Sequence, residues 1–173
     1  MIIIILFLVF ATMYISAPTE KIKDYKIKRN FQIRNEIAII IDDNTNMELL
    51  NEAIKYFDVD FRIIDWKENI MSNIYQSGYR VVIIDIDKNI PIDLVDEMII
   101  INSRNKLLNC YNIQKHHTDI YTLWDSIILA YECLKYIDGK MDKNYIMNLA
   151  TRYTFGYSGM IKFDEEGNRI YDM

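Results

Sequence analysis

Runs of β-branched residues alternate with amphipathic segments between residues 36 and 101, and this alternation is the main structural signal in the sequence. The unbroken run Ile37–Ile41 predicts a strand that is covered on both faces, as in a parallel sheet. Further strands are expected at Phe61–Asp65, Arg80–Ile86 and Met98–Ile101. Because helical segments separate these strands, the pattern predicts an α/β fold with a parallel sheet, flanking helices and right-handed crossovers.

The first intervening helix is expected to begin at a cap formed by Asn44 or Asn46 and to run to about Phe57. Its inward side would hold Met47, Leu50, Ala53, Ile54 and Phe57. A second helix is expected within Lys67–Ser77, with Gly78 as the residue that ends it. Its apolar positions are Ile70, Ile74 and, less regularly, Met71.

Pro91 suits the first turn of a third helix, with Leu94 and Val95 directed inward. Asn102–Thr118 is polar and has no clear period. Beyond it, capped by Thr118 or Asp119, a long helix ends at Gly139. Its wide apolar stripe consists of Ile120, Leu123, Trp124, Ile127, Ala130, Tyr131, Leu134 and Ile137, and we interpret this stripe as core.

Asp142 is expected to cap a shorter helix that runs to about Arg152. Its inward residues would be Tyr145, Ile146 and Leu149. The chain then ends in a predicted β-hairpin, in which Met160, Ile161 and Phe163 form one strand and Ile170-Tyr171 begins the return strand. Asp164–Asn168 is the turn, because Asp and Asn bond their own backbone and Gly167 supplies a positive φ.

Composition supports one globular domain without favouring a particular chemistry. The 173 residues are 51% hydrophobic, and a net charge of −5 gives no reason to expect nucleic-acid binding. Cys110 and Cys133 either pair once in an oxidising compartment or are two unrelated buried thiols. His116 and His117 are adjacent and lack a third ligand at convincing spacing, so no metal site is predicted.

The N-terminal segment 1–17 is an apolar leader, and its run Met1–Ile15 is shorter than the roughly 20 residues that span a bilayer. We interpret it as a secretory signal peptide or hydrophobic leader. If it were retained as an anchor, the cluster of basic residues that follows would favour a cytoplasmic downstream side. That cluster consists of Lys21, Lys23, Lys26, Lys28 and Arg29.

The C-terminal third resembles a known family. Phe155-Gly156, Ser158-Gly159, Phe163-Asp164 and Gly167-Asn168-Arg169 are similar to the pattern F-x-G-x-T-G-x-x-x-(F/I)-D-x-x-G-D-R. That pattern closes the extracellular ligand-binding region of receptor guanylyl cyclases and natriuretic-peptide receptors, which belong to the periplasmic-binding-protein type I superfamily. The helix segment Trp124–Tyr131 resembles the helix that precedes this hairpin in the family.

Two strand regions in the middle of the chain also resemble the family, namely Ile37–Asp43 and Ser77–Ile83. The resemblance implies that residues 36–101 correspond to the second lobe of a two-lobed clamshell, and that residues 119–173 are the C-terminal helices and hairpin. Most of the first lobe has no counterpart, so the chain resembles a shortened, incomplete relative. A lone lobe would expose apolar surface unless it repacks or associates.

The resemblance implies non-catalytic recognition of a peptide or small extracellular ligand, with any cyclase activity in domains outside this chain. It implies no cofactor, no catalytic residue and no metal, a secreted or extracellular location, and a homodimer as one allowed assembly. By fold analogy a ligand would bind near Asp43–Thr45 and Asp87–Asn89, but no individual ligand-binding residue is assigned.

A second resemblance competes with the first. Asp42-Asp43-Asn44, Asp85 and Ile90-Pro91 are similar to a phosphoacceptor receiver domain, in which acidic residues at strand ends hold Mg²⁺. The interval from Asp85 to Ser103 looks too short for that fold, and Lys115 is not followed by proline.

The simplest interpretation of the strand-end acids is solvation, for Asp42, Asp43, Asp65, Asp85 and Asp87 alike. A structural or interaction protein that kept the fold and lost ligand binding is the third alternative.

Overall fold

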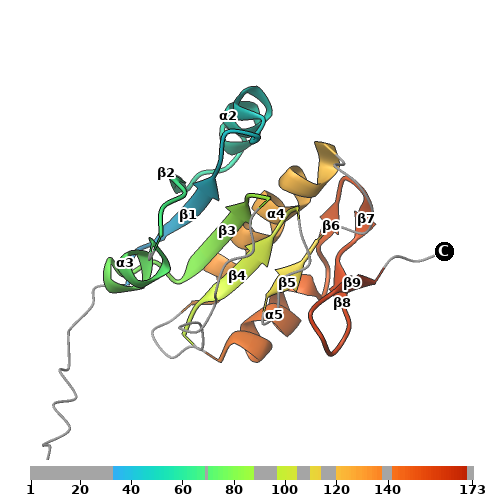
Figure 1. Ribbon diagram of the computed structural model, residues 1–173. Coiled ribbons are helices and arrows are strands. Elements are labelled where there is room, and N and C mark those ends of the chain that lie inside the picture. Colours follow the sequence, from blue (N-terminus) through green and yellow to red (C-terminus); the bar gives the residue numbers. More distant parts are fainter. Residues whose placement is uncertain are drawn as a thin grey trace, which may run out of the picture. The chain divides into compact units, whose positions relative to one another are not determined.

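The computed structural model describes residues 33–68, 70–87, 97–104, 110–113, 120–137 and 142–170. All of them belong to one unit, Phe31–Met173. Its centre is a five-stranded parallel sheet in the order β2-β1-β3-β4-β5 (Figure 1). The strands are β1 (Glu36–Ile41), β2 (Asp60–Asp65), β3 (Val81–Asp85), β4 (Ile99–Asn102) and β5 (Tyr111–Asn112). The α/β class and the parallel sheet predicted from the sequence are confirmed.

The isoleucine run of β1 lies at the heart of the sheet. Ile39 is opposite Ile63 of β2 on one side and Ile83 of β3 on the other. Because side chains alternate across a strand, Ile37 and Ile39 enter one core layer, while Ile40 enters the layer on the opposite face. Burial of consecutive residues on both faces is what an unbroken apolar run predicts.

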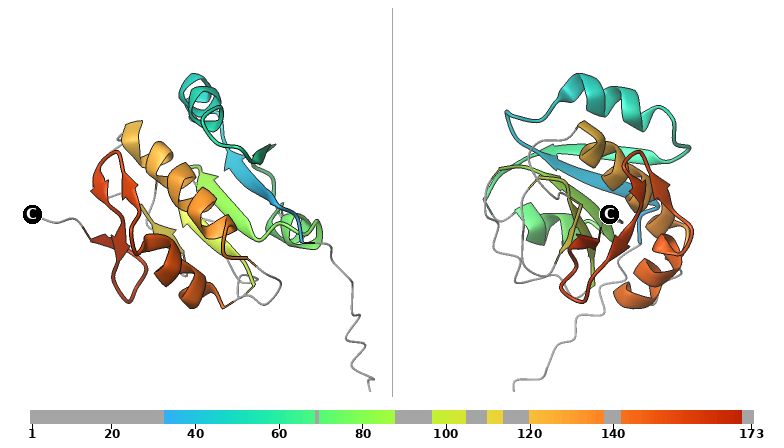
Figure 2. Two further views of the ribbon diagram at one scale, coloured as in Figure 1. Left: turned by 180° about the vertical axis from the view of Figure 1, so that it is seen from behind. Right: turned by 90° about the vertical axis from the view of Figure 1, so that its right-hand side faces the viewer.

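Four described helices cover the two faces (Figure 2). Helices α2 (Met47–Ile54), α4 (Ile120–Leu134) and α5 (Lys143–Thr151) contribute to the core layer that contains Ile39, and α3 (Ile70–Gln76) contributes to the other layer. The regions 36–101 and 119–173 therefore share one hydrophobic core in this protein.

The helix caps agree with the sequence, but two inward assignments are wrong. Asn46 accepts a hydrogen bond from Leu49 N at 3.1 Å, and Asp142 caps α5 in the same way. Met47 is 38% exposed and Tyr145 is 63% exposed, although both were expected inside. Each lies in the first turn of its helix, and burial begins only with later residues of the stripe.

The C-terminal segment forms two small antiparallel ribbons instead of the single predicted hairpin. The first joins β6 (Phe155–Gly156) to β7 (Gly159–Met160), and the second joins β8 (Lys162–Phe163) to β9 (Arg169–Ile170). Met160 and Phe163, which were assigned to one strand, therefore belong to different ribbons, because Arg169 and Ile170 pair back only as far as Lys162. The predicted turn is confirmed: Asp164 Oδ1 accepts from the backbone of Glu166 and Asn168, and Gly167 has a φ of 80°.

The second ribbon also covers one edge of the sheet. Asn112 of β5 donates its backbone N–H to Gly167 O at 2.8 Å and forms a parallel bridge with Asn168. The strand β5 was missed in the polar interval 102–118 because two residues carry no measurable alternation.

Several predictions lie outside the described residues: the leader 1–17, the helix after Pro91, the histidines 116 and 117, and the helix end at Gly139. Within the described part of the chain, no helix has both the length and the apolar character needed to cross a membrane.

Candidate functional site

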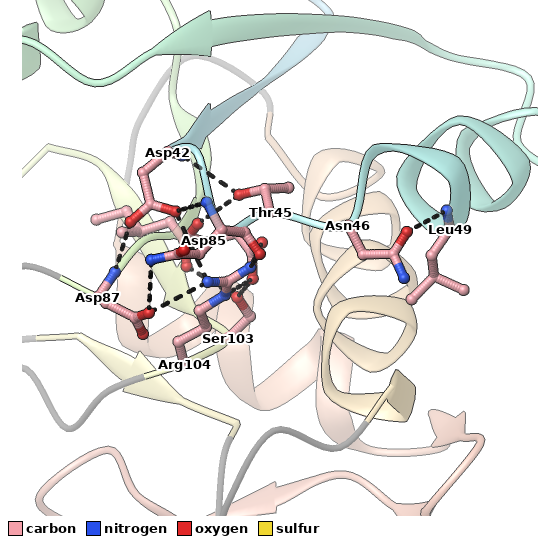
Figure 3. Close-up of polar contacts among 10 residues, drawn as sticks. Asp42, Thr45, Asn46, Leu49, Asp85, Asp87, Ser103 and Arg104 are labelled. Atoms are coloured by element: carbon pink, nitrogen blue, oxygen red, sulfur yellow. Dashed lines mark hydrogen bonds and ion pairs between the residues drawn. The ribbon is translucent and has the colours of Figure 1, made fainter.

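Three loops meet at the carboxyl ends of β1, β3 and β4, where polar side chains gather into one cluster (Figure 3). In a sheet with this strand order the topology reverses between β1 and β3, and open α/β sheets bind ligands in the crevice at that position. We call Asp42, Asp85, Asp87, Ser103 and Arg104 the carboxyl-edge cluster.

Asp42, directly after β1, connects the first two loops. Its Oδ1 accepts from Asn44 N at 2.9 Å, and its Oδ2 accepts from Asp87 N at 3.0 Å. Thr45 adds a third connection by donating its hydroxyl to the backbone oxygen of Asp85 at 2.8 Å. These bonds fix the loop after β1 against the end of β3.

Arg104, one residue beyond Ser103, is the centre of the cluster. It holds Asp85 with a two-pronged contact, Nε to Oδ1 at 3.1 Å and Nη2 to Oδ2 at 3.0 Å. Its Nη1 lies 3.4 Å from Asp87 Oδ2 and 3.7 Å from Asp42 Oδ1, and its Nη2 donates to Asn44 O at 2.5 Å. Three carboxylates and one guanidinium sum to a formal charge of −2.

Exposure differs sharply within the cluster. The side chain of Asp85 is 5% exposed and that of Arg104 is 11% exposed, whereas that of Asp87 is 51% exposed. Asp87 therefore presents an open carboxylate at the rim, above a guanidinium that is already oriented. Preorganised charged groups of this kind can recognise a ligand with little rearrangement.

Ser103 brings β4 into the same cluster. Its hydroxyl donates to a carboxylate oxygen of Asp85 and lies 3.1 Å from Ile84 O. The interval from Asp85 to Ser103 looked too short in the sequence, but parallel pairing of β3 with β4 places the two side chains in contact.

The solvation interpretation holds for Asp43 and Asp65, which are exposed, and is wrong for Asp85, which is buried. The reason is Arg104, which sequence reasoning did not single out and which compensates the buried carboxylate. The signal in the sequence was a basic residue two positions after a buried strand, at the edge of the sheet where Asp42 follows β1 and Asp85 ends β3.

A second Asp–Arg cluster holds the residues that carry the family resemblance. Asp125 of α4 and Arg169 of β9 form an ion pair at 2.5 Å, and both side chains are 0% exposed. Asp125 also accepts from the backbone N–H of Tyr157 and from Ser158, while Arg169 Nη2 donates to Gly159 O at 3.1 Å. We call this set the buried knot.

Gly156 is part of the knot for a steric reason. A Cβ at this position would overlap the carboxylate of Asp125. The motif residues Gly156, Ser158, Gly159 and Arg169 therefore hold the terminal ribbons to α4. Since the side chains of Asp125 and Arg169 are both 0% exposed, we interpret their ion pair as structural.

The two cysteines are free and buried, and they do not pair. Cys110 and Cys133 belong to core layers on opposite faces of the sheet. Of the two alternatives from the sequence, a disulfide or two unrelated buried thiols, the structure shows the second. Burial raises the pKa of Cys110 to about 12 and raises that of Cys133 as well, so neither thiol is poised as a nucleophile.

The described residues contain no group of three or more His, Cys, Asp or Glu side chains arranged to hold a metal ion. Within the carboxyl-edge cluster the guanidinium of Arg104 supplies the positive charge between the carboxylates. In comparisons with known proteins, no protein-family model matches the chain, and a search of curated proteins returns no match.

Proposed function

We propose that the protein is a non-catalytic recognition module of receptor type, and that its ligand binds at the carboxyl-edge cluster. The observation that carries the proposal is Arg104, which is held by Asp85 and joins three loops at the crevice where open α/β sheets bind ligands. The residues similar to receptor guanylyl cyclases support the same role, because they build the buried knot that completes the fold.

The chemistry of the cluster favours a small polar ligand or the terminus of a peptide. Asp87 offers an exposed carboxylate for an ammonium group, and the formal charge of −2 on the cluster favours a cationic ligand group. The nitrogens of Arg104 already contact Asp85, Asp87, Asp42 and Asn44 O, so Arg104 holds the acids in place for such a ligand. The ammonium group of an amino acid or of a peptide N-terminus would match Asp87. It would leave Asp42 and Thr45 free to keep the loops in place.

The proposal includes no catalytic step. Cyclase activity would belong to further domains of a longer receptor, and the ligand would be met on the extracellular side or after secretion. A homodimer is compatible with this role and is not required for it.

Isothermal titration calorimetry of the full chain against free amino acids and short unblocked peptides tests the proposal. Wild type should bind at least one of these ligands. Arg104→Lys should lower the affinity for that ligand about tenfold, because lysine cannot reproduce the planar, two-pronged contact of arginine. Asp43→Asn is the matched control, since Asp43 is an exposed acid in the same loop. Absence of binding, or equal affinity of wild type and Arg104→Lys, would contradict the proposal.

A second candidate function has one specific observation in its favour. The hydroxyl of Ser103 rests on Asp85, and the strand order is that of flavodoxin-like sheets, to which receiver domains belong. Asp85 would then be a phosphoacceptor, although Arg104 occupies both of its oxygens in the structure. Phosphate incorporation from acetyl phosphate with Mg²⁺ in wild type, and none in Asp85→Asn, would support this candidate. No incorporation in wild type would dismiss it.

A further inference from the structure

The two edge strands of the described sheet, β5 and β2, differ in what they pair with. The edge at β5 is covered, because Asn112 bonds to the turn of the second ribbon. The edge at β2 pairs with β1 alone among the described strands. An open edge of this kind is a template for a further strand unless charges or geometry prevent pairing.

The hydrogen-bond pattern shows which groups of β2 point outward. Trp66 N, just after the strand, donates to Ile41 O of β1 at 2.9 Å. In a parallel ladder alternate residues bond to the same neighbour, so Arg62 and Ile64 also face β1. The backbone N–H and C=O groups of Phe61 and Ile63 therefore point away from β1.

A hollow of about 810 Å³ runs beside this edge on the α3 side. Among the residues that line it, Tyr79 donates its hydroxyl to Glu36 at 3.1 Å. Arg34 pairs with Glu36 at 3.1 Å, and its guanidinium lies 5.3 Å from the Tyr79 ring centre. Arg34 and Glu36 thus balance each other. Arg62 also lines the hollow, as do Asp65, Lys67 and Glu68. None of the ion pairs between described residues includes Arg62.

The side chains on the two faces of β2 differ in chemistry. Phe61 and Ile63 are half-buried and pack on the core layer of α2 and α4, whereas Arg62 is exposed and directed to the hollow. A strand laid along this edge would place alternate side chains beside these two surfaces. Because Arg62 lies outside the described ion pairs, an acidic side chain opposite it would be complementary, and apolar side chains would match Phe61 and Ile63.

We propose that the edge of β2 binds an extended peptide segment of a partner protein as a sixth strand, with an acidic residue between two apolar residues. Outward backbone groups supply the hydrogen bonds, and Arg62 selects the acidic side chain. This site lies apart from the carboxyl-edge cluster and does not depend on the ligand proposed there.

Calorimetric titration of the full chain with the blocked peptide acetyl-Thr-Val-Thr-Val-Glu-Val-Thr-amide tests the proposal. We expect wild type to bind it, and Arg62→Glu to bind it about tenfold or more weakly because a charge-assisted contact becomes repulsive. The same peptide with Lys in place of Glu should show the reverse preference, binding Arg62→Glu better than wild type.

Backbone pairing is tested on the peptide, so that the fold of the protein is untouched. Methylating alternate backbone nitrogens along one edge leaves every side chain in place and should abolish binding. Binding that survives methylation, equal binding of the Glu and Lys peptides, or no binding to wild type would each overturn the proposal. Far-ultraviolet circular dichroism of Arg62→Glu must match wild type, and a folded variant that binds the Glu peptide as well as wild type would also overturn it.

Discussion

The buried knot and the carboxyl-edge cluster are both built around an ion pair between an aspartate and an arginine, but the two pairs have different surroundings. In the knot, Asp125 and Arg169 are both 0% exposed and join a helix to the terminal ribbons. In the cluster, Asp85 and Arg104 lie under a rim opened by Asp87, whose side chain is 51% exposed. The comparison teaches that burial, more than residue type, separates an ion pair that holds a fold from one that can meet a ligand.

The energetic contrast follows from solvation. Removing one partner of a fully buried pair leaves a charge without water or counter-ion, which costs about 3–5 kcal/mol. The Asp85–Arg104 pair is also largely buried, at 5% and 11% exposure, but it lies beside the exposed Asp87, so water can reach it more easily once a partner is lost. The knot should therefore dominate stability, and the cluster should be more tolerant of change.

The largest effect is expected from Asp125→Ala. Arg169 would lose its carboxylate partner inside the core, and the partly buried backbone N–H of Tyr157 would lose its acceptor. The free energy of unfolding should therefore fall by about 3–5 kcal/mol in urea titrations. Glu132→Ala is the control on the same helix, because Glu132 pairs with Lys135 at the surface. It should change stability by less than about 1 kcal/mol, and a similar loss for both variants would refute the contrast.

Gly156→Ala should have the next largest effect. Its methyl group would overlap the carboxylate of Asp125, and we expect a loss of about 2–3 kcal/mol. Gly159→Ala provides the comparison, because its Cβ meets nothing within 4 Å and only its φ of +105° is strained. That strain should cost about 1 kcal/mol. A lower unfolding temperature for Gly159→Ala than for Gly156→Ala would contradict the steric role of Gly156 beside Asp125.

Arg104→Ala should lower stability less than either knot variant. Asp85 would lose its two-pronged partner but remain close to the open rim, so we expect a loss of about 1–2 kcal/mol. The measurement is urea unfolding monitored by tryptophan fluorescence. A loss as large as that of Asp125→Ala would show that the cluster also holds the fold.

The smallest expected effect concerns alkaline pH. Burial raises the pKa of the Cys110 thiol from 9.0 to about 12, so between these values the unfolded chain releases a proton that the folded chain keeps. The stabilising contribution is complete well below pH 9 and is lost as pH rises toward 12, by about 1.4 kcal/mol at pH 10. Cys110→Ala should show a flatter decline in urea unfolding at pH 8–10, and an unchanged slope would contradict this.

The longer strands and the helices of the described residues 36–151 could be predicted, because each depends on local periodicity. The run Ile37–Ile41 and the caps Asn46 and Asp142 carry their own signals, and each lies where the sequence placed it. The two-residue strand β5 could not be found in this way, since it exists through its contacts with β4 and the second ribbon.

The sites depend on long-range geometry and were only partly visible in the sequence. Asp42 and Asp85 were recognised as strand-end acids, but their interpretation changed once Arg104 was seen to join them. The motif residues of the terminal segment and the helix segment Trp124–Tyr131, which contains Asp125, were found by resemblance. The contact between Asp125 and Arg169, which are 44 residues apart, was not predicted. No period or spacing indicates a contact of that kind.

The most direct test compares Arg169→Lys with Arg104→Lys in the same urea titration. Both variants keep the positive charge and remove the planar fork, so burial is the main difference between the two sites. The account predicts that Arg169→Lys loses at least about 2 kcal/mol more unfolding free energy than Arg104→Lys. Equal losses, or a larger loss for Arg104→Lys, would contradict the division of the protein into a structural knot and a recognition cluster.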